Sequence, residues 1–195
     1  MLLSLLAAAV MAAAFSGAAV AQDARRGAEL AAHSCGNCHG ADGRSQMADI
    51  PSLAGQPAGY VTVQLILFRE GIRQVPAMLA FAANMPDKDV EDLAAYYASL
   101  PPGPPDDRGP REDALFAAGR AVAEARNCGV CHLPGFAGRE QVPRLAAQRE
   151  EYLVRAMTEY RDGNRVGVDS QMNGAVFGLS NADLAALAHY LSHLD

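Results

Sequence analysis

A five-residue motif occurs twice in this chain of 195 residues, as CGNCH at residues 35–39 and as CGVCH at residues 128–132. Two cysteines separated by two residues and followed at once by a histidine are typical of covalent c-type haem attachment. Each thiol forms a thioether with the haem, and the histidine lies beneath the iron as its proximal ligand. We therefore expect two covalently bound haems, with iron, attached at Cys35, Cys38, Cys128 and Cys131 and ligated by His39 and His132.

Other uses of four cysteines are weaker alternatives. The cysteines of an exported chain can form two disulfides, each pair can act as a redox dithiol, or the two pairs can share one zinc ion. None of these requires a histidine after the second cysteine in both copies. A zinc ribbon has its pairs closer together, and a thioredoxin-like pair occurs in a βαβ context that is missing here. Two disulfides remain the main alternative to two haems.

Further repetition indicates two domains of one kind. The segment LAGQ at residues 53–56 returns 92 residues later as LAAQ at 145–148, and FREGIR at 68–73 returns as YRDGNR at 160–165. Nearer the end of each half the offset becomes 94. A tandem duplication explains this ordered agreement. Because alanine and leucine, which favour helices, dominate the composition, we expect an all-α fold of two tandem domains, each a small helical fold around one haem.

Composition also suggests the domain limits. Residues 1–21 carry no charge and end in Ala-Val-Ala, which predicts a secretory signal peptide cleaved after Ala21, although their length also permits an uncleaved membrane anchor. Residues 101–111 are rich in proline, which excludes them from the interior of a helix or sheet and predicts a linker. The predicted domains are therefore 22–100 and 112–195. Because c-type haem is attached outside the bacterial cytoplasm, the export signal fits the motifs, and we expect a periplasmic protein.

Apolar periodicity predicts the helices of the first domain. Helices are expected over residues 23–33, with Asp23 as N-cap, over 60–70 and over 87–100. Residues 72–84 are expected to form a loop that carries Met78. His33 precedes the first motif on a polar face, which favours a solvated side chain over an iron ligand.

The second axial ligand is sought among the methionines, because a thioether is the soft donor that completes many electron-transfer haems. Met78 stands seven residues before Met85, and Met172 stands seven before Leu179. The repeat therefore pairs Met78 with Met172 and leaves Met85 opposite a leucine. Of the remaining methionines after residue 21, Met47 has no methionine counterpart and Met157 lies in a predicted buried helix. Met78 and Met172 are the predicted ligands, although a lone methionine commonly fills a core.

Two further pairs of residues are candidates for supporting roles. Pro51 and Pro143 follow the motif histidines by 12 and 11 residues, so their carbonyls can accept the second imidazole N–H, although a purely conformational role fits equally well. Arg73 and Arg165 end matching Gly-x-Arg turns and can pair with haem propionates, whereas most loop arginines are solvated.

The charge pattern narrows the class of function. The formal net charge is -6 and no basic run is present, which argues against a nucleic-acid partner. No Ser-His-Asp set or phosphate-binding loop is present either. If both irons are six-coordinate, no site is open to a substrate. The pattern therefore favours an electron carrier over an enzyme.

The combined order of CxxCHGxDG, PxLAGQ, FxxGxR, methionine, DxD and LAxY resembles the diheme cytochrome c4 family, which is built from two class I cytochrome c domains. The resemblance covers essentially the whole chain from residue 22. It implies a periplasmic carrier that moves electrons between redox protein partners: a respiratory complex or dehydrogenase as donor, and a terminal oxidase or reductase as acceptor. It also supports Met78 and Met172 as ligands and implies that the two domains pack face to face.

The second half departs from this pattern, with Leu133 in place of the glycine after CxxCH and Ala147 in place of Gly55. An alternative function is the electron-accepting subunit of a redox enzyme, such as the cytochrome subunit of a flavocytochrome c sulfide dehydrogenase. A peroxidase-like or gas-binding haem protein is a third hypothesis, which requires an open iron. Docking at a membrane surface also remains open.

Overall fold

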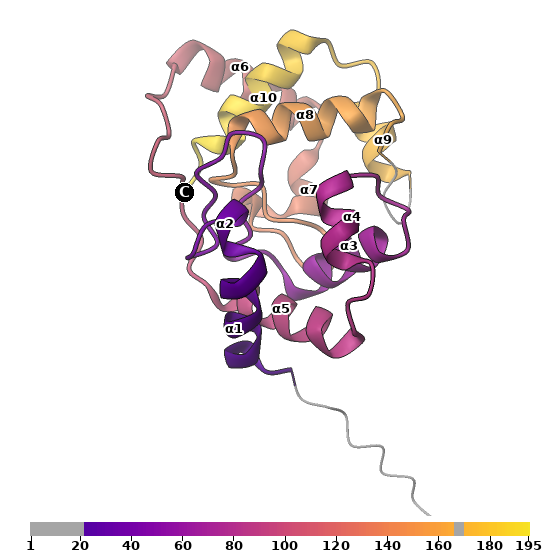
Figure 1. Cartoon of the computed structure of the whole chain (residues 1–195). Helices are drawn as coiled ribbons and strands as arrows, with labels where there is room; N and C mark the ends of the chain where they lie inside the picture. Colours follow the sequence, from indigo (N-terminus) through magenta and orange to yellow (C-terminus); the bar gives the residue numbers. More distant parts are fainter. Residues whose placement is uncertain (1–21, 166–169) are drawn as a thin grey trace, which may run out of the picture.

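The computed structural model describes residues 22–165 and 170–195, so the predicted signal peptide lies outside the described residues. Within these ranges the chain is helical and has no strand, apart from one isolated bridge between Arg139 and Val142. One group of helices precedes the proline-rich segment and a second follows it, and the two groups lie side by side (Figure 1). The expected all-α fold of two tandem helical units is confirmed.

The two units contain the same helices in the same order. The first unit comprises α1 (Ala24–Ser34), α2 (Gly36–His39), α3 (Ala58–Arg69), α4 (Pro76–Ala82) and α5 (Asp87–Ser99). The second comprises α6 (Asp113–Ala125), α7 (Cys128–His132), the 3-10 turn η1 (Pro134–Phe136), α8 (Glu150–Arg161), α9 (Gln171–Val176) and α10 (Asn181–Ser192). Helix α5 packs on α1 and α3, and α10 packs on α6 and α8 in the same way. The duplication of sequence is therefore a duplication of structure.

A glycine at the same place in each unit lets its first and last helices approach closely. A Cβ atom added at Gly27 of α1 would overlap the Asp92 carbonyl of α5. A Cβ atom added at Gly119 of α6 would overlap the Ala186 carbonyl of α10. These two helix crossings set the frame in which each CxxCH motif is held.

The expected loop over residues 72–84 is wrong in part, because residues 76–82 form α4. Pro76 suits the first turn of a helix, where its missing N–H is not needed, and the alanines and Leu79 that follow favour helix. Helix α9 is the equivalent element of the second unit. Met78 and Met172 therefore lie on short helices that precede α5 and α10.

Other local expectations agree with the structure. The Asp23 carboxylate accepts hydrogen bonds from the amides of Arg25 at 3.0 Å and Arg26 at 3.3 Å and so caps α1. The His33 ring is exposed and contacts the Glu29 carbonyl within its own helix. Residues 101–111 contain no helix or strand. Among the described residues no helix is long and apolar enough to cross a membrane.

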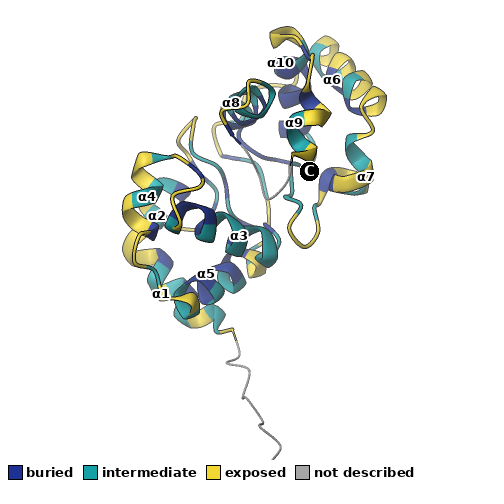
Figure 2. Cartoon of the chain, turned by 90° about the vertical axis from the view of Figure 1, so that its right-hand side faces the viewer, coloured by how far each residue is buried: buried dark blue, intermediate teal, exposed yellow. Residues whose placement is uncertain are grey.

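Each unit has its own apolar core (Figure 2). The first core is built on Val61, Leu65, Val90, Leu93 and Tyr97, and the second on Leu153, Met157, Leu184, Leu187 and Leu191. Partly buried Cys35 and Met78 pack against the first core, and Cys128 and Met172 pack against the second. Each core therefore brings an attachment cysteine and a candidate distal methionine to one place.

Candidate haem-binding sites

One continuous cavity of about 1020 Å³ extends through both units. Interiors of folded proteins are close-packed, with few voids larger than a water molecule, so a space of this size is a candidate ligand-binding site. Its wall includes every predicted attachment and ligand residue: Cys35, Cys38, His39, Met78, Cys128, Cys131, His132 and Met172. The structure thus brings together all of the site residues that the sequence selected.

The four cysteines lie at or within the short helices α2 and α7. All four are free thiols, and the disulfide alternative therefore finds no support in the structure. Burial raises the pKa of the Cys35 and Cys128 thiols. The arrangement leaves both members of each pair facing the cavity, as two-point attachment of a planar group requires.

Both motif histidines are buried and oriented by a proline carbonyl. His39 Nδ1 lies 2.9 Å from the Pro51 oxygen, and His132 Nδ1 lies 2.9 Å from the Pro143 oxygen. Because a carbonyl only accepts, Nδ1 carries the proton, and Nε2 keeps the lone pair that a metal binds. Burial lowers the pKa of both imidazoles, which favours this neutral, ligating form. The predicted role of the two proline carbonyls is confirmed.

Met78 and Met172 are partly buried at equivalent places in the cavity wall. Met85 and Leu179 also reach the wall, and their amides make equivalent hydrogen bonds, to Ala82 at 2.9 Å and to Val176 at 3.2 Å. These bonds confirm that the repeat pairs Met85 with a leucine. Met78 and Met172 are accordingly the two methionines that occupy equivalent positions in the two units.

The other methionines are placed differently. Met47 is 49% exposed and lies outside the cavity wall. Met157 also reaches the cavity wall, but it is buried within α8 as a member of the second core. Neither has an equivalent methionine in the other unit, so the structure offers no paired role for them.

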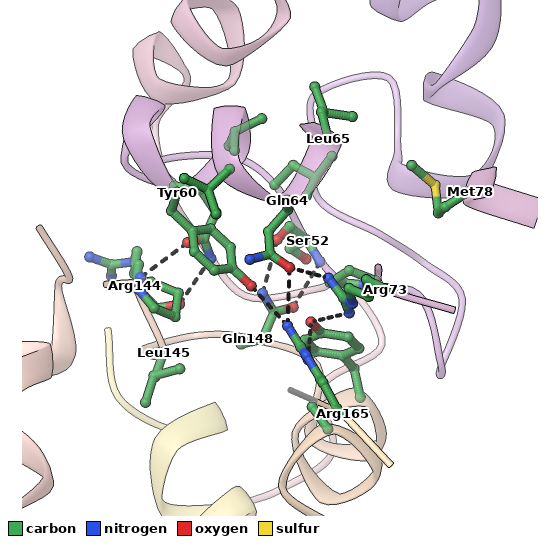
Figure 3. Close-up of a pocket in the computed structure, with 18 of the residues that line it drawn as sticks. Ser52, Tyr60, Gln64, Leu65, Arg73, Met78, Arg144, Leu145, Gln148 and Arg165 are labelled. Carbon is green, nitrogen blue, oxygen red and sulfur yellow. Dashed lines mark hydrogen bonds between the residues drawn. The ribbon is translucent and has the colours of Figure 1, made fainter. Parts of the chain in front are cut away.

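Arg73 and Arg165 lie where the two units meet, each more than 90% buried (Figure 3). Arg73 donates to Gln64 Oε1 at 2.6 Å and to the Tyr152 hydroxyl at 3.5 Å. Arg165 donates to the Tyr152 hydroxyl, to the Tyr60 hydroxyl and to Gln64 Oε1, each at 3.4 Å. Among the described residues no carboxylate pairs with either guanidinium. We call these five residues the seam cluster: Tyr60, Gln64, Arg73, Tyr152 and Arg165.

The seam cluster has an excess of buried positive charge. Burial by itself opposes ionisation of Tyr152, yet Arg165 and Arg73 beside it lower its pKa to about 7. Arg73 Nε is also buried without an acceptor. Buried charges are costly unless an opposite charge accompanies them. A haem, which has an apolar ring and two propionate carboxylates, fits a cavity that joins apolar cores to this cationic wall.

Two glutamines lock the units together by reciprocal hydrogen bonds. Gln148 accepts from the Ser52 amide at 2.7 Å and donates to the Ser52 carbonyl at 2.9 Å. Gln56 binds Arg144 in the same way, accepting from its amide at 3.0 Å and donating to its carbonyl at 2.9 Å. The predicted face-to-face packing is therefore observed. The two glutamines recur at the repeat offset of the sequence. This repetition does not show that each one forms hydrogen bonds with the other unit.

Family models match both halves of the chain. Residues 22–96 match the family described as cytochrome c oxidase, cbb3-type, subunit III, and residues 116–195 match the family described as cytochrome c. The chain is 35% identical to cytochrome c4 of Pseudomonas aeruginosa over 167 residues, which covers 82% of this chain and 83% of that protein. It is 32% identical to a thiosulfate dehydrogenase electron acceptor of Stutzerimonas stutzeri over 178 residues, which covers 86% and 82% of the two chains.

Solved structures agree with these matches. The crystal structure of reduced recombinant cytochrome c4 from Pseudomonas stutzeri superposes with a TM-score of 0.82 at 31% identity, covering 90% of this chain and all of that one. The thiosulfate dehydrogenase TsdBA from Marichromatium purpuratum superposes with a TM-score of 0.78 at 32% identity, covering 88% of this chain and 40% of that chain. The similarity therefore extends over both helical units.

Proposed function

The chain belongs to the cytochrome c4 family and is a diheme electron-transfer cytochrome with two covalently bound c-type haems, and on this basis we propose how its own residues hold and use them. In the first site Cys35 and Cys38 form the thioethers, and His39 and Met78 ligate the iron. In the second site Cys128, Cys131, His132 and Met172 have the same roles. The observation that carries the proposal is that all eight residues line one cavity in two equivalent sets.

Each part of the site has a defined physical task. When bound, the haem would supply one-electron redox chemistry, and a histidine and a methionine of this chain would hold its iron in both oxidation states. The Pro51 and Pro143 carbonyls fix the orientation of the imidazoles. Helices α4 and α9 carry the methionines, and each follows the CxxCH helix of its own unit in the sequence. Arg73 and Arg165 neutralise propionate charge where the units meet.

The domain division and the location of the protein are part of the proposal. Residues 1–21 direct export and are removed, residues 22–100 and 112–195 each hold one haem, and residues 101–111 link them. The protein then works in the periplasm. The homogeneous N-terminus of the purified protein, read by peptide mass mapping, is expected at Gln22. A chain that retains residues 1–21 would support membrane anchoring instead.

Redox proteins are the partners of this cytochrome. We propose a respiratory complex or a dehydrogenase as electron donor and a terminal oxidase or reductase as acceptor. The likeness to proteins named thiosulfate dehydrogenase electron acceptors favours a second candidate, in which this chain accepts electrons directly from one dehydrogenase. Purification from the source cells without added salt discriminates the two. A dehydrogenase that co-purifies and reduces the cytochrome supports the second candidate, and a free carrier supports the first.

The ligand assignment is tested with Met78→Ala and Met172→Ala. Each variant is expected to convert one haem to the high-spin form while both haems stay covalently bound, because only one axial bond is lost. Met85→Leu is the matched control, since Leu179 already occupies that position in the second unit, and both of its haems should remain low-spin. Two low-spin, methionine-ligated haems in either alanine variant would refute the assignment. Visible absorption and magnetic circular dichroism read the spin states.

A further inference from the structure

Tyr97 has a buried hydroxyl that lies within hydrogen-bond distance of no other atom in the described part of the chain. Its side chain lies on α5 in the core of the first unit, and the residue is only 2% exposed. Among the described residues the Cys35 thiol is near enough to interact with the hydroxyl, but it lies beyond hydrogen-bond distance, whereas most buried polar atoms in native proteins have a partner. Tyr97 also lines the cavity. An unpartnered donor at the wall of a ligand cavity points to an acceptor on the ligand.

The hydroxyl is next to the attachment cysteine of the first site. Cys35 packs against the same core as Tyr97. Burial raises the pKa of the Cys35 thiol, and the neighbouring Tyr97 hydroxyl offsets part of that rise. The O–H group therefore faces the point at which the first haem is joined to the chain.

The second unit has no hydroxyl at the equivalent position. The Gly55 amide binds the Tyr97 carbonyl at 2.9 Å, and the equivalent Ala147 amide binds the Leu191 carbonyl at 3.1 Å. Leu191 therefore occupies the position of Tyr97 in the second unit. It is 1% exposed and lines the cavity, but its side chain has no polar atom. The two sites differ at this position by one buried hydroxyl.

We propose that Tyr97 donates a hydrogen bond to the first haem group, at the haem or at its Cys35 thioether sulfur, and thereby raises the midpoint potential of this haem relative to the second. The proposal rests on the haem attachment given under the proposed function. Reduction adds one electron to ferric iron and gives ferrous iron, while the tyrosine keeps its proton. An O–H dipole with its positive end toward the haem stabilises the reduced state, and hydrogen bonding is one of the means by which proteins set haem potentials.

Tyr97→Phe removes the hydroxyl and keeps the ring. We expect one midpoint to move to lower potential and the other to stay in place, as measured by spectroelectrochemical titration of the complete diheme protein. A single hydrogen bond corresponds to a roughly two- to tenfold change in the reduction equilibrium constant. For a one-electron couple, tenfold equals about 59 mV.

Tyr96→Phe is the matched control. Tyr96 packs beside Tyr97 with ring centroids 5.1 Å apart, but its hydroxyl faces the Ala41 carbonyl at 3.4 Å, outside the cavity wall. This variant is expected to leave both midpoints unchanged. The midpoint that Met172→Ala displaces identifies the second haem, so the Tyr97→Phe shift should fall on the other one.

The intact mass of each variant shows whether both haems are attached, and this separates a failure of haem attachment from a failure of the role of Tyr97. A chain without two haems would overturn the proposed function itself. Two haems with both midpoints unchanged in Tyr97→Phe, or a shift of the second haem's midpoint, would overturn the role of Tyr97 alone. An equal shift in Tyr96→Phe would show that any loss of a tyrosine hydroxyl from α5 has this effect, and would also overturn it.

Discussion

Gln148 of the second unit holds both backbone polar groups of Ser52 in the first. Ser52 directly follows Pro51, whose carbonyl orients His39. The glutamine of one unit thus secures the segment that supports the proximal histidine of the other. Gln56 makes the reciprocal contact with Arg144, which follows Pro143. The geometry at each proximal histidine therefore depends on the contact between the units.

Gln148→Ala tests this dependence. The variant leaves the amide and the carbonyl of Ser52 buried without partners, and an unsatisfied buried polar group costs about 1–3 kcal/mol. We expect a lower free energy of unfolding in urea and a changed midpoint for the first haem. Gln74→Ala is the control, because the Gln74 side chain donates to the Gly71 carbonyl within its own exposed turn. Equal stability of the two variants would contradict the account.

Asp92 predicts a loss of stability in acid. Its side chain is fully buried and accepts hydrogen bonds from Lys88, the Asp23 amide and Arg26. Burial by itself raises the pKa of this carboxyl, but these bonds more than offset burial and lower it to about 2. A group with a depressed folded pKa stabilises the fold above its ordinary value of 3.8, and this contribution is lost as pH falls from there towards 2.

Urea unfolding at neutral pH and between pH 4 and 2 measures this contribution. Asp92→Asn is expected to be less stable than the parent at neutral pH and to lose less stability on acidification. Asp87→Asn, which removes an exposed carboxylate at the start of the same helix, is the control. If Asp92→Asn and the parent lost stability in parallel over this range, the carboxylate would have no such role.

The helix crossings are tested by Gly27→Ala and Gly119→Ala. In each variant the new methyl group overlaps a carbonyl of the facing helix, so the helices must move apart. Overpacking of this kind costs about 1–3 kcal/mol. Thermal unfolding of the diheme protein should show destabilisation in both variants and none in Gly109→Ala, whose methyl group would meet no atom within 4 Å. Unchanged stability of Gly27→Ala would contradict the observed approach of α1 and α5.

Leu133 predicts a stabilising substitution. It has a φ of 67° and a ψ of 163°, in a region that is essentially restricted to glycine, and the equivalent residue is Gly40 with a φ of 85°. Leu133→Gly should relieve this strain and raise the free energy of unfolding by about 1 kcal/mol. Leu133→Ala keeps the Cβ atom and therefore the strain, so it should give no gain. Equal effects of the two substitutions would show that strain is not the cause.

The features that could be predicted from the sequence are those that depend on a local pattern or on the repeat. The CxxCH motifs, the pairing of Met78 with Met172 and the orienting carbonyls of Pro51 and Pro143 can all be found by comparing the two halves. The helices follow from apolar periodicity, with limits that differ by one or two residues. Helix α4 lies in the segment expected to be a loop; it has only seven residues, too few to show an apolar period.

Contacts between the units could not be predicted, because they join residues about 90 positions apart whose spacing has no local signature. For Arg73 and Arg165 the sequence left two alternatives, pairing with propionates or solvation, and the structure excludes solvation because it buries both with Tyr60 and Tyr152 between the units. The difference between Tyr97 and Leu191 is visible in the aligned halves. That this difference bears on the haem could not be predicted, because only the structure shows that the tyrosine hydroxyl is buried and lies within hydrogen-bond distance of no described residue.

Mass spectrometry of the purified intact protein and of its peptides tests the central claim most directly. Two haems per chain are predicted, one on the peptide that contains Cys35 and Cys38 and one on the peptide that contains Cys128 and Cys131. A chain with no porphyrin, or with a disulfide within each pair, would contradict the account.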